Sequence, residues 1–258
     1  MNLDDITPLV LTWNEELNIG RTLAALSWAR RILVVDSYSD DRTAALVAEH
    51  PRTELLQRKF DTFADQCAFG QAQVCTSHTL SLDADHAVSP QLLDELRSLD
   101  PNGAEAWVAP FVYCVGGRPL RASLLPPRIV LFRTAAGRYE NDGHGHRVCV
   151  DGRVAALRRP ILHDDRKPLR RWVAAQVRYA GQEADKLCAT AWRGLGWADR
   201  LRRWHLAPLL IVPYCLLVRG LILDGRPGWH YALQRLLFEV LLSLMLLDRR
   251  LAGTGHEP

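Results

Sequence analysis

The chain has 258 residues, of which 48% are hydrophobic and 24% are charged, and its formal net charge is +3. These values exclude an intrinsically disordered chain and leave room for one large domain or for a domain with an appendage. The charge is unevenly spread: residues 1–152 carry 14 Lys/Arg against 20 Asp/Glu, whereas residues 153–206 carry 13 against 5. The signatures of common nucleic-acid modules are absent, so we expect no nucleic-acid partner. Apolar segments follow the basic block directly, which favours anionic lipid head groups as its partner.

Six cysteines are scattered along the chain without the spacing of a metal site. The first residues lack the basic and apolar regions of a signal peptide. We therefore expect reduced thiols and a cytoplasmic protein.

Strand and helix signals alternate along the first part of the chain. The predicted elements are a strand at 8–11, a helix at 15–30, a strand at 32–35, a helix at 43–50, a strand at 54–57, a helix at 63–74 and a strand at 79–82. Strands separated by helices predict a mainly parallel sheet flanked by helices, an α/β fold. In such sheets ligands bind at the carboxyl ends of the strands.

Polar residues stand at three of these strand ends. They are Thr12, Asn14 and Glu15 after the first strand, Asp36 after the second, and Asp83 and Asp85 after the fourth. Each has a structural alternative, because such residues also cap helices and hold turns. Three polar strand ends that converge on one rim nevertheless favour a ligand site.

The pair Asp83 and Asp85 carries the strongest chemical signal. Two carboxylates at i and i+2 of an extended segment point to the same face and repel each other by ~3 kcal/mol at an effective dielectric of ~20. A divalent cation between them removes this cost, and oxygen ligands suit Mg²⁺ or Mn²⁺. Asp-x-Asp also occurs by chance in solvated loops, so the pair alone leaves that alternative open.

Three motifs in order carry a family resemblance. They are TWNEELNIG at 12–20, VVDSYSDDRT at 34–43 and LSLDAD at 80–85. The series resembles glycosyltransferase family 2, and within it the lipopolysaccharide-core β-1,4-glucosyltransferase-like branch. The resemblance continues through 127–133, 142–144, 162–165 and 224–226, and so covers nearly the whole chain.

The resemblance implies a GT-A type fold and a nucleotide diphosphate sugar donor, expected to be UDP-linked. The positions that match the nucleoside-binding residues of the family are Thr12, Asn14, Glu15 and Asp36. Asp83 matches a residue near the ribose or the metal, and Asp85 matches the ligand of the metal that bridges the diphosphate. In this fold a late histidine can complete the metal shell, which makes His163 a further candidate ligand.

The family is inverting, so a side chain must accept the proton of the attacking hydroxyl. Asp142 and His144 lie where the family places its acceptor-side residues; Asp142 is the preferred base and His144 the alternative. Arg128 is a candidate phosphate clamp. Two positions depart from the family: Cys67 and Ala68 stand where many relatives carry lysine and asparagine, and Tyr38 stands where relatives often have glycine.

The last third of the chain holds two apolar segments, 207–223 and 229–247. Prolines or charged residues interrupt both, so neither is a clean membrane span. The preferred interpretation is monotopic attachment to the membrane, and the alternative is packing on the catalytic domain or on a second subunit. We therefore expect a catalytic domain at 1–168 and a helical, basic and apolar extension at 169–258.

Together these observations predict a metal-dependent inverting hexosyltransferase that acts on a glycan or lipid-linked acceptor in cell-envelope polysaccharide synthesis. Its expected place is the cytoplasmic, inner face of the plasma membrane, and the sequence leaves the oligomeric state open. One alternative is a sugar-phosphate nucleotidyltransferase, although the Gly-rich basic loop expected of such an enzyme is missing after the first strand. Another is a non-catalytic, membrane-associated relative.

Overall fold

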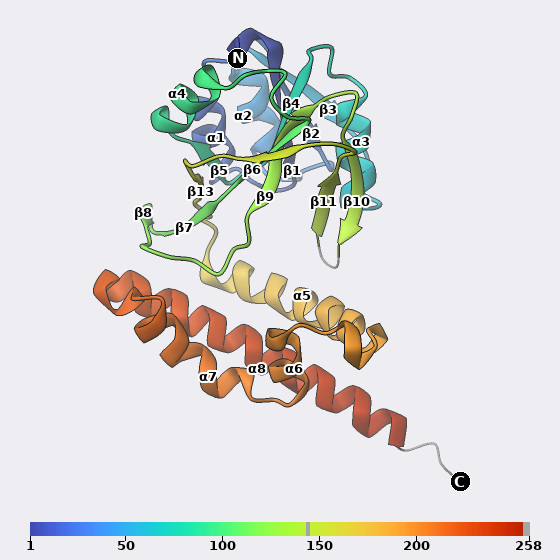
Figure 1. The fold of residues 1–258 in the computed structure, drawn as a ribbon, viewed down its shortest axis with the longest axis vertical. Coiled ribbons are helices and arrows are strands. Elements are labelled where there is room, and N and C mark those ends of the chain that lie inside the picture. The colour runs from blue at the N-terminus through green and yellow to red at the C-terminus, as the bar shows by residue number, and fades with distance from the viewer. Residues whose placement is uncertain (143–144, 255–258) are drawn as a thin grey trace. The chain divides into compact units, whose positions relative to one another are not determined.

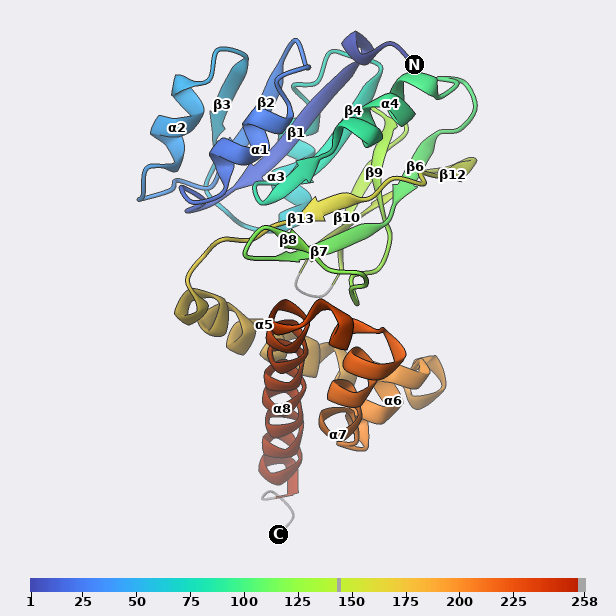
Figure 2. The same ribbon diagram turned by 90° about the vertical axis from the view of Figure 1, so that its left-hand side faces the viewer.

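The computed structural model describes residues 1–142 and 145–254. The chain forms two compact units. The first comprises Met1–Pro119 and Ser123–Lys167, and the second comprises Leu120–Ala122 and Pro168–Pro258. Figure 1 and Figure 2 show the first as strands and helices and the second as helices alone.

The first unit alternates strands and helices before it turns mainly to strands. Its elements are the 3-10 turn Leu3–Asp5, β1 (Ile6–Thr12), α1 (Ile19–Ala25), β2 (Ile32–Asp36), α2 (Thr43–Glu49), β3 (Thr53–Gln57), α3 (Phe63–Gln71), β4 (His78–Asp83), β5 (His86–Val88), α4 (Pro90–Ser98), β6 (Ala106–Ala109), β7 (Phe111–Val115), β8 (Arg118–Pro119), β9 (Arg128–Arg133), β10 (Arg138–Asp142), β11 (Gly145–Cys149), β12 (Val154–Ala156) and β13 (Ile161–His163).

A seven-stranded sheet in the order β12-β6-β9-β4-β1-β2-β3 forms the centre of this unit. The pairs β1–β2, β1–β4, β2–β3 and β6–β12 are parallel, whereas β9 runs antiparallel to both β4 and β6. The mainly parallel sheet predicted from the sequence is confirmed. Because β1, β2 and β4 run in the same direction, the polar residues at their carboxyl ends come to one edge.

Alternate residues of the strands face opposite layers of helices. Val10 and Val34 belong to a core that also includes Leu23 of α1 and Leu96 of α4. The neighbouring strand residues, such as Leu9, pack with the α3 side instead. Helices α1, α2 and α4 thus cover one face and α3 the other (Figure 1). A strand that is buried on both faces reads as a continuous apolar run, which explains why the sequence revealed these strands.

Two smaller pieces complete the first unit. A four-stranded sheet has the order β5-β13-β7-β8, and β10 and β11 form an antiparallel pair. In the first of these, β13 pairs with β5 so that His163 lies opposite His86. This pairing brings a residue from late in the chain beside the turn that follows β4.

One predicted helix is much shorter than expected. The apolar spacing at 15–30 predicted a single helix, but α1 spans only Ile19–Ala25. The residues before it form a turn in which Asn14 has a φ of 56°. This backbone lies outside the helical region, so the polar residues after β1 form a loop at the rim of the sheet.

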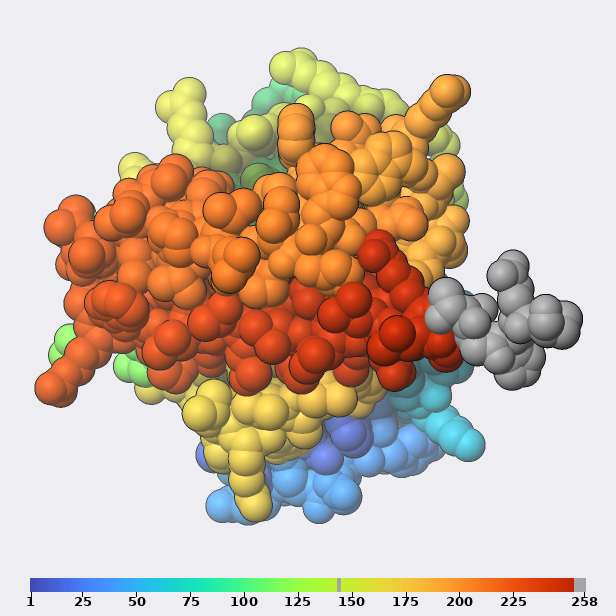
Figure 3. All heavy atoms as spheres, turned by 90° about the horizontal axis from the view of Figure 1, so that it is seen from below, coloured from blue at the N-terminus to red at the C-terminus, as the bar shows by residue number. Residues whose placement is uncertain are grey.

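The second unit is helical. Its elements are α5 (Leu169–Ala189), the 3-10 turn Trp192–Gly194, α6 (Trp197–Arg203), α7 (Ala207–Pro213), the π-helical turn Tyr214–Val218, the 3-10 turn Leu221–Asp224 and α8 (Arg226–Thr254). Small residues on α5, including Ala180 and Ala184, pack against Phe238 and Leu242 of α8. Helix α8 also contacts α6 and α7, and Figure 3 shows it beside the orange α6–α7 segment.

One charged group is buried among these helices. Glu239 of α8 is 2% exposed, and it accepts hydrogen bonds from Arg202 of α6 at 2.9 and 3.1 Å. Arg235, one turn earlier on α8, lies 3.5 Å from the same carboxylate. These ion pairs attach α6 to α8 and neutralise a charge in the middle of an apolar helix.

By length and composition, residues 226–252 of α8 could cross a membrane, with a mean hydropathy of 1.3 in the most apolar window. About two fifths of that window, 39%, is buried by the protein itself. Length and hydropathy alone therefore do not separate a spanning helix from a core helix.

Candidate functional site

The loops after β1 and β2 are held together by hydrogen bonds. Thr12 and Asp36 are partners in the parallel register. Beyond them, the Asn14 backbone N–H donates to Ser39 Oγ at 2.8 Å, and the Asp40 N–H donates to Asn14 Oδ1 at 2.9 Å. Asn14 and Tyr38 both have positive φ, 56° and 57°. Left-handed backbone at non-glycine residues is strained and is concentrated at functional sites.

Asp36 is completely buried, and its carboxylate is engaged within its own loop. It accepts hydrogen bonds from the Ser39 N–H at 3.0 Å, from the Ser39 hydroxyl and from Gln57 Nε2 at 3.3 Å. In this arrangement Asp36 shapes the loop. Beside it, Thr12 Oγ1 is buried and has no hydrogen-bond partner among the described residues.

The two acids of the Asp-x-Asp pair occupy different environments. Asp83 is the last residue of β4, and Asp85 lies in the turn that leads to β5. The Asp83 side chain is 39% exposed, whereas that of Asp85 is 10% exposed. The Asp85 backbone carbonyl also accepts a hydrogen bond from the Asp164 N–H at 2.9 Å. The chain segment after β13 is thereby held beside the turn.

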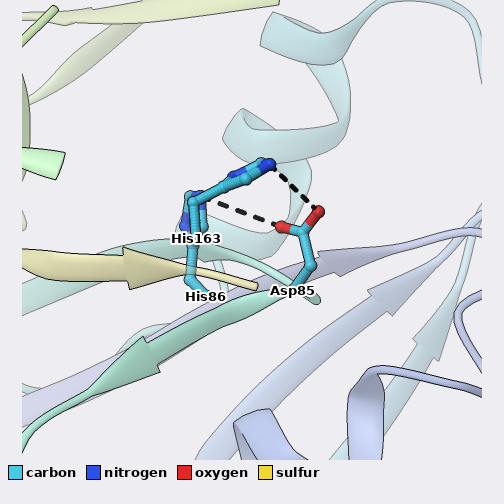
Figure 4. A group of neighbouring side chains, drawn as sticks. All are labelled: Asp85, His86 and His163. Carbon is cyan, nitrogen blue, oxygen red and sulfur yellow. Dashed lines mark ion pairs between the residues drawn. The ribbon is translucent and has the colours of Figure 1, made fainter. Parts of the chain in front are cut away.

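Asp85, His86 and His163 form a group with the spacing of a metal site. One potential ligand atom from each lies within 4.8 Å of the others, and Figure 4 shows Asp85 facing both imidazoles. His163 Nε2 lies 3.7 Å from Asp85 Oδ2. Asp85 Oδ1 is buried and accepts no hydrogen bond within the described part of the chain. A buried carboxylate oxygen without a donor, next to an imidazole, fits a cation site.

The potential at this edge favours the ionised form of Asp83. Burial alone would raise the pKa of its carboxyl, but electrostatic interactions with nearby groups outweigh burial and lower it. The groups are His86, His146, Arg128 and His163. Asp83 therefore stays anionic near neutral pH. Two of these groups, Arg128 and His163, are predicted site residues that come to the same edge.

Glu15 connects the loop after β1 to the segment after β13. Its carboxylate accepts hydrogen bonds from Asn18 Nδ2 at 2.7 Å and from the Lys167 ammonium. Burial first, and then the negative charge of Asp85, raise the pKa of Glu15 to about 7, against the opposing effect of Lys167. Glu15 is thus near Asp85 in space, and its charge is sensitive to whatever binds there.

The hairpin of β10 and β11 carries the predicted bases. Asp142 ends β10 with an exposed side chain, and His144 lies outside the described residues. His146 of β11 instead lies among aromatic rings, 6.1 Å from Phe63 and 5.5 Å from Tyr139 between ring centroids. Burial lowers the pKa of His146 against the opposing charge of Asp83. His146 is therefore neutral near pH 7.

Sequence reasoning missed four polar residues of this edge. They are Asn18, His86, His146 and Lys167. Only His86 had a direct signal, because it follows the Asp-x-Asp pair. Lys167 and Asn18 meet through Glu15 and Asp165, and Asn18 Nδ2 donates to Asp165 Oδ1 at 2.9 Å. Such contacts across about 150 residues leave no trace in local spacing.

Solved structures with a similar fold include nucleotide-sugar enzymes. A mannosyltransferase from Pyrobaculum calidifontis, solved with GDP-Man and Mn²⁺, matches with a TM-score of 0.55 and 15% identity, over 94% of this chain and 87% of that one. Staphylococcus aureus TarS, solved with UDP-GlcNAc, matches with a TM-score of 0.49 and 14% identity, over 96% and 92%. Mycobacterium tuberculosis glucosyl-3-phosphoglycerate synthase, solved with Mn²⁺, UDP and phosphoglyceric acid, reaches 0.45 and 13%, over 74% and 81%. At these identities the likeness concerns the fold alone, and only the mannosyltransferase score supports it.

The family follows from the sequence comparison. The sequence model of the family described as "Glycosyl transferase family 2" matches residues 9–164. That range is more than half of the chain and includes the second half of β1 and the Asp-x-Asp pair, and it ends just after His163. With the mainly parallel sheet flanked by helices, this match establishes that the chain belongs to glycosyltransferase family 2 and has the GT-A fold.

Proposed function

We propose that the protein is a metal-dependent, inverting hexosyltransferase that uses a nucleotide diphosphate sugar, UDP-linked, as its donor. Its acceptor is a glycan or a lipid-linked glycan of the cell envelope, as in the lipopolysaccharide-core glucosyltransferase-like branch that the motifs resemble. Residues 1–168 form the catalytic part and residues 169–258 attach it to the membrane. Family membership favours glycosyl transfer over the nucleotidyltransferase alternative.

One observation carries this proposal. The Asp85 side chain is nine-tenths buried, and its Oδ1 atom accepts no hydrogen bond among the described residues while an imidazole lies 3.7 Å from its other oxygen. A carboxylate in this state is costly unless a cation binds it. Asp85 and His163 would hold Mg²⁺ or Mn²⁺, and such a cation stabilises the charge that grows on the diphosphate as the sugar bond breaks.

The other polar residues of this edge contact the nucleoside, the ribose and the diphosphate of the donor. Thr12, with its unpartnered hydroxyl, and Asn14 face the nucleoside, while Asp36 holds the loop that contacts it. Asp83 accepts ribose hydroxyl hydrogens or supports the cation site. Arg128, whose charge acts on Asp83, contacts the diphosphate, where it replaces the lysine that this chain lacks after β3.

The proton of the acceptor hydroxyl requires a base on the β10–β11 hairpin. Asp142 and His144 are the residues that the family resemblance favours. His146 is an additional candidate because it is neutral near pH 7 and is electrostatically linked to Asp83. A neutral imidazole accepts a proton directly, and general base catalysis contributes roughly 10²–10⁴-fold to the rate.

The donor is tested by screening nucleotide sugars for thermal stabilisation of the full chain with Mn²⁺. We expect one UDP-sugar to stabilise the wild type and to have a weaker effect on Asp85→Asn. The matched control is Asp94→Asn, because Asp94 is an exposed acid on α4. A donor that stabilises Asp85→Asn as much as the wild type contradicts the cation site.

The base is tested by single-turnover transfer with Asp142→Asn, His144→Gln and His146→Gln. The variant of the true base loses roughly 10²–10⁴-fold in transfer rate while donor binding is kept. The other two variants change the rate much less. Full rates in all three would refute a base on this hairpin.

Membrane attachment is supported by where apolar side chains remain exposed. Of the large hydrophobic residues that are exposed in the described chain, all but five lie in the second unit. On α8 they form one stripe at helical spacing, made of Leu233, Leu237, Val240, Leu244, Leu247 and Leu251. Apolar stripes of this kind, next to basic residues, are typical of helices that lie in a membrane interface.

The attachment is tested by co-sedimentation of the full chain with vesicles. The double variant Leu217→Glu/Leu223→Glu removes two side chains that are 68% and 70% exposed. Each buried leucine contributes about 1.5–3 kcal/mol, so binding to anionic vesicles should fall at least tenfold. Phe60→Glu, at an exposed apolar residue of the first unit, is the control and should bind normally. Equal binding of all three proteins contradicts attachment through this unit.

A further inference from the structure

The metal that suits the group Asp85, His86 and His163 depends on how many of its imidazoles act as ligands. Two imidazoles and one carboxylate are the ligand set of non-haem Fe²⁺ sites, and imidazole ligands also favour Zn²⁺. One imidazole with carboxylate and phosphate oxygens suits Mn²⁺ or Mg²⁺ instead. The answer depends on whether His86 has a free nitrogen lone pair that faces the site.

The backbone of Asp83 determines the tautomer of His86. The Asp83 N–H donates a hydrogen bond to His86 Nδ1 at 2.9 Å. A backbone N–H can only donate, so Nδ1 must be the unprotonated acceptor, and the ring proton resides on Nε2. A protonated Nδ1 would place two hydrogens against each other, which excludes both the other tautomer and the imidazolium form in this geometry.

The protonated Nε2 of His86 lies near the two acids, at distances longer than an ordinary hydrogen bond. Nε2 lies 3.5 Å from Asp83 Oδ2 and 3.8 Å from Asp85 Oδ1. A nitrogen that carries a proton has no lone pair for a metal. It can instead donate toward the carboxylates and reduce the repulsion between them. Asp85 Oδ1, at the longer of these two distances, has no hydrogen-bond partner among the described residues.

Packing keeps the ring in this orientation. The His86 side chain is 6% exposed, and its ring centroid lies 5.1 Å from that of Phe111 and 5.4 Å from that of His163. Asp83 and His86 flank the two-residue turn between β4 and β5. A ring flip would break the Asp83 hydrogen bond and move an imidazole within a close-packed environment.

We propose that His86 is a positioning residue that holds Asp83 and Asp85 through its Nε2–H, and that the cation is bound by Asp85 and His163 without His86. This inference rests on the proposed metal site and refines it. With one imidazole and oxygen ligands, the site suits Mn²⁺ or Mg²⁺. His86 lies in the outer shell of the site and orients the carboxylates that contact the cation.

Histidine tautomers are read directly by long-range ¹H–¹⁵N NMR of the wild-type full chain, without any activity. We expect His86 to appear as the Nε2–H tautomer both before and after saturation with Mg²⁺, while the His163 resonances shift. An Nδ1–H tautomer, or loss of the His86 Nε2 proton when Mg²⁺ is added, overturns the proposal. If no resonance responds to Mg²⁺, the metal site itself fails, while the His86 tautomer is still measured.

Two isosteric variants provide a second test through Mn²⁺ affinity, measured by electron paramagnetic resonance with the metal alone. The amide of His86→Gln reaches the position of Nε2 and keeps a donor to the acids, so its affinity should stay within about threefold of the wild type. His86→Asn reaches only the position of Nδ1, and His163→Gln loses a direct ligand; each should cost roughly 10–100-fold. Equal losses in both His86 variants, with folding verified by circular dichroism, would indicate that His86 is itself a ligand.

Discussion

Two groups of buried acids in this molecule differ in whether positively charged partners neutralise them. In the helical unit, Glu239 accepts three hydrogen bonds from Arg202, and Arg235 lies beside it. In the sheet unit, Asp85 keeps an oxygen without a partner among the described residues, and it raises the pKa of Glu15 together with burial. The first group stabilises the fold, whereas the second costs stability. Uncompensated charge of the second kind is typical of sites that bind a ligand.

The comparison therefore distinguishes acids that are neutralised within the fold from acids that are expected to act in the proposed site. Neutralising a structural acid lowers the stability of the protein, because the partner of that acid loses its compensating charge. Neutralising an acid of the active site lowers the activity of the enzyme, while the stability of the protein is unchanged or increases. The following variants test this distinction.

Asp85→Asn should have the largest effect. We expect transfer to fall roughly 10²–10³-fold, because the variant removes a charge that supports the leaving diphosphate. Thermal unfolding without metal should stay unchanged or move upward, since carboxylate repulsion is relieved. Asp83→Asn should cost less activity, because Asp83 is more exposed. Equal losses in the two variants would mean that both acids are direct ligands.

Glu239→Gln should give the reverse pattern. Removing the charge takes this partner from Arg235 and leaves Arg202 its contacts with Asp199 at 3.2 Å and Glu183 at 3.6 Å, and it should cost about 3 kcal/mol of unfolding free energy. The melting temperature falls by roughly 6–12 °C, while the donor KM at a permissive temperature is unchanged. Asp248→Asn, at an exposed acid on the same helix, is the control. An unaltered melting curve for Glu239→Gln would show that the buried ion pairs contribute nothing.

Ser39→Ala tests the loop pair at the ends of β1 and β2. The hydroxyl accepts the Asn14 N–H and donates to Asp36, so its loss removes two hydrogen bonds and should cost about 1–2 kcal/mol. The donor KM should rise with little change in kcat, because we propose that the loop contacts the nucleoside. Ser98→Ala, at an exposed serine, serves as the reference. A kcat defect at normal KM would contradict this assignment.

The raised pKa of Glu15 predicts a small dependence of protein stability on pH. Its pKa rises from 4.5 to about 7 in the folded chain, so between these values the folded state binds more protons than the unfolded state. Stability from this group is therefore present at low pH and lost as the pH rises through 7. In metal-free buffer, Glu15→Gln should flatten the melting temperature between pH 5 and 8 by roughly 2–4 °C. Identical pH profiles would show that the Glu15 pKa is not raised.

Much of the first unit was predictable because its signals are local. The buried strands β1, β2 and β4 are short apolar runs, and the polar residues after them reach one edge because the three strands are parallel. Helix α1 was overestimated, since apolar spacing does not reveal the turn at Asn14. The roles of Asp142, His144 and Arg128 remain predictions. His146 was missed because its environment is made by the rings and charges of neighbouring residues, which other elements of the chain contribute.

The sequence by itself determined the family, the alternation of the first strands and helices along the chain and the presence of the Asp-x-Asp pair, because each depends on residues that are close along the chain. Only the tertiary structure decided which polar groups meet. His163 lies opposite His86 through the pairing of β13 with β5, and Lys167 reaches Glu15 across the same edge. The proton of His86 is assigned by a backbone N–H within a folded turn, because a tautomer depends on hydrogen-bond geometry that residue identities alone do not contain.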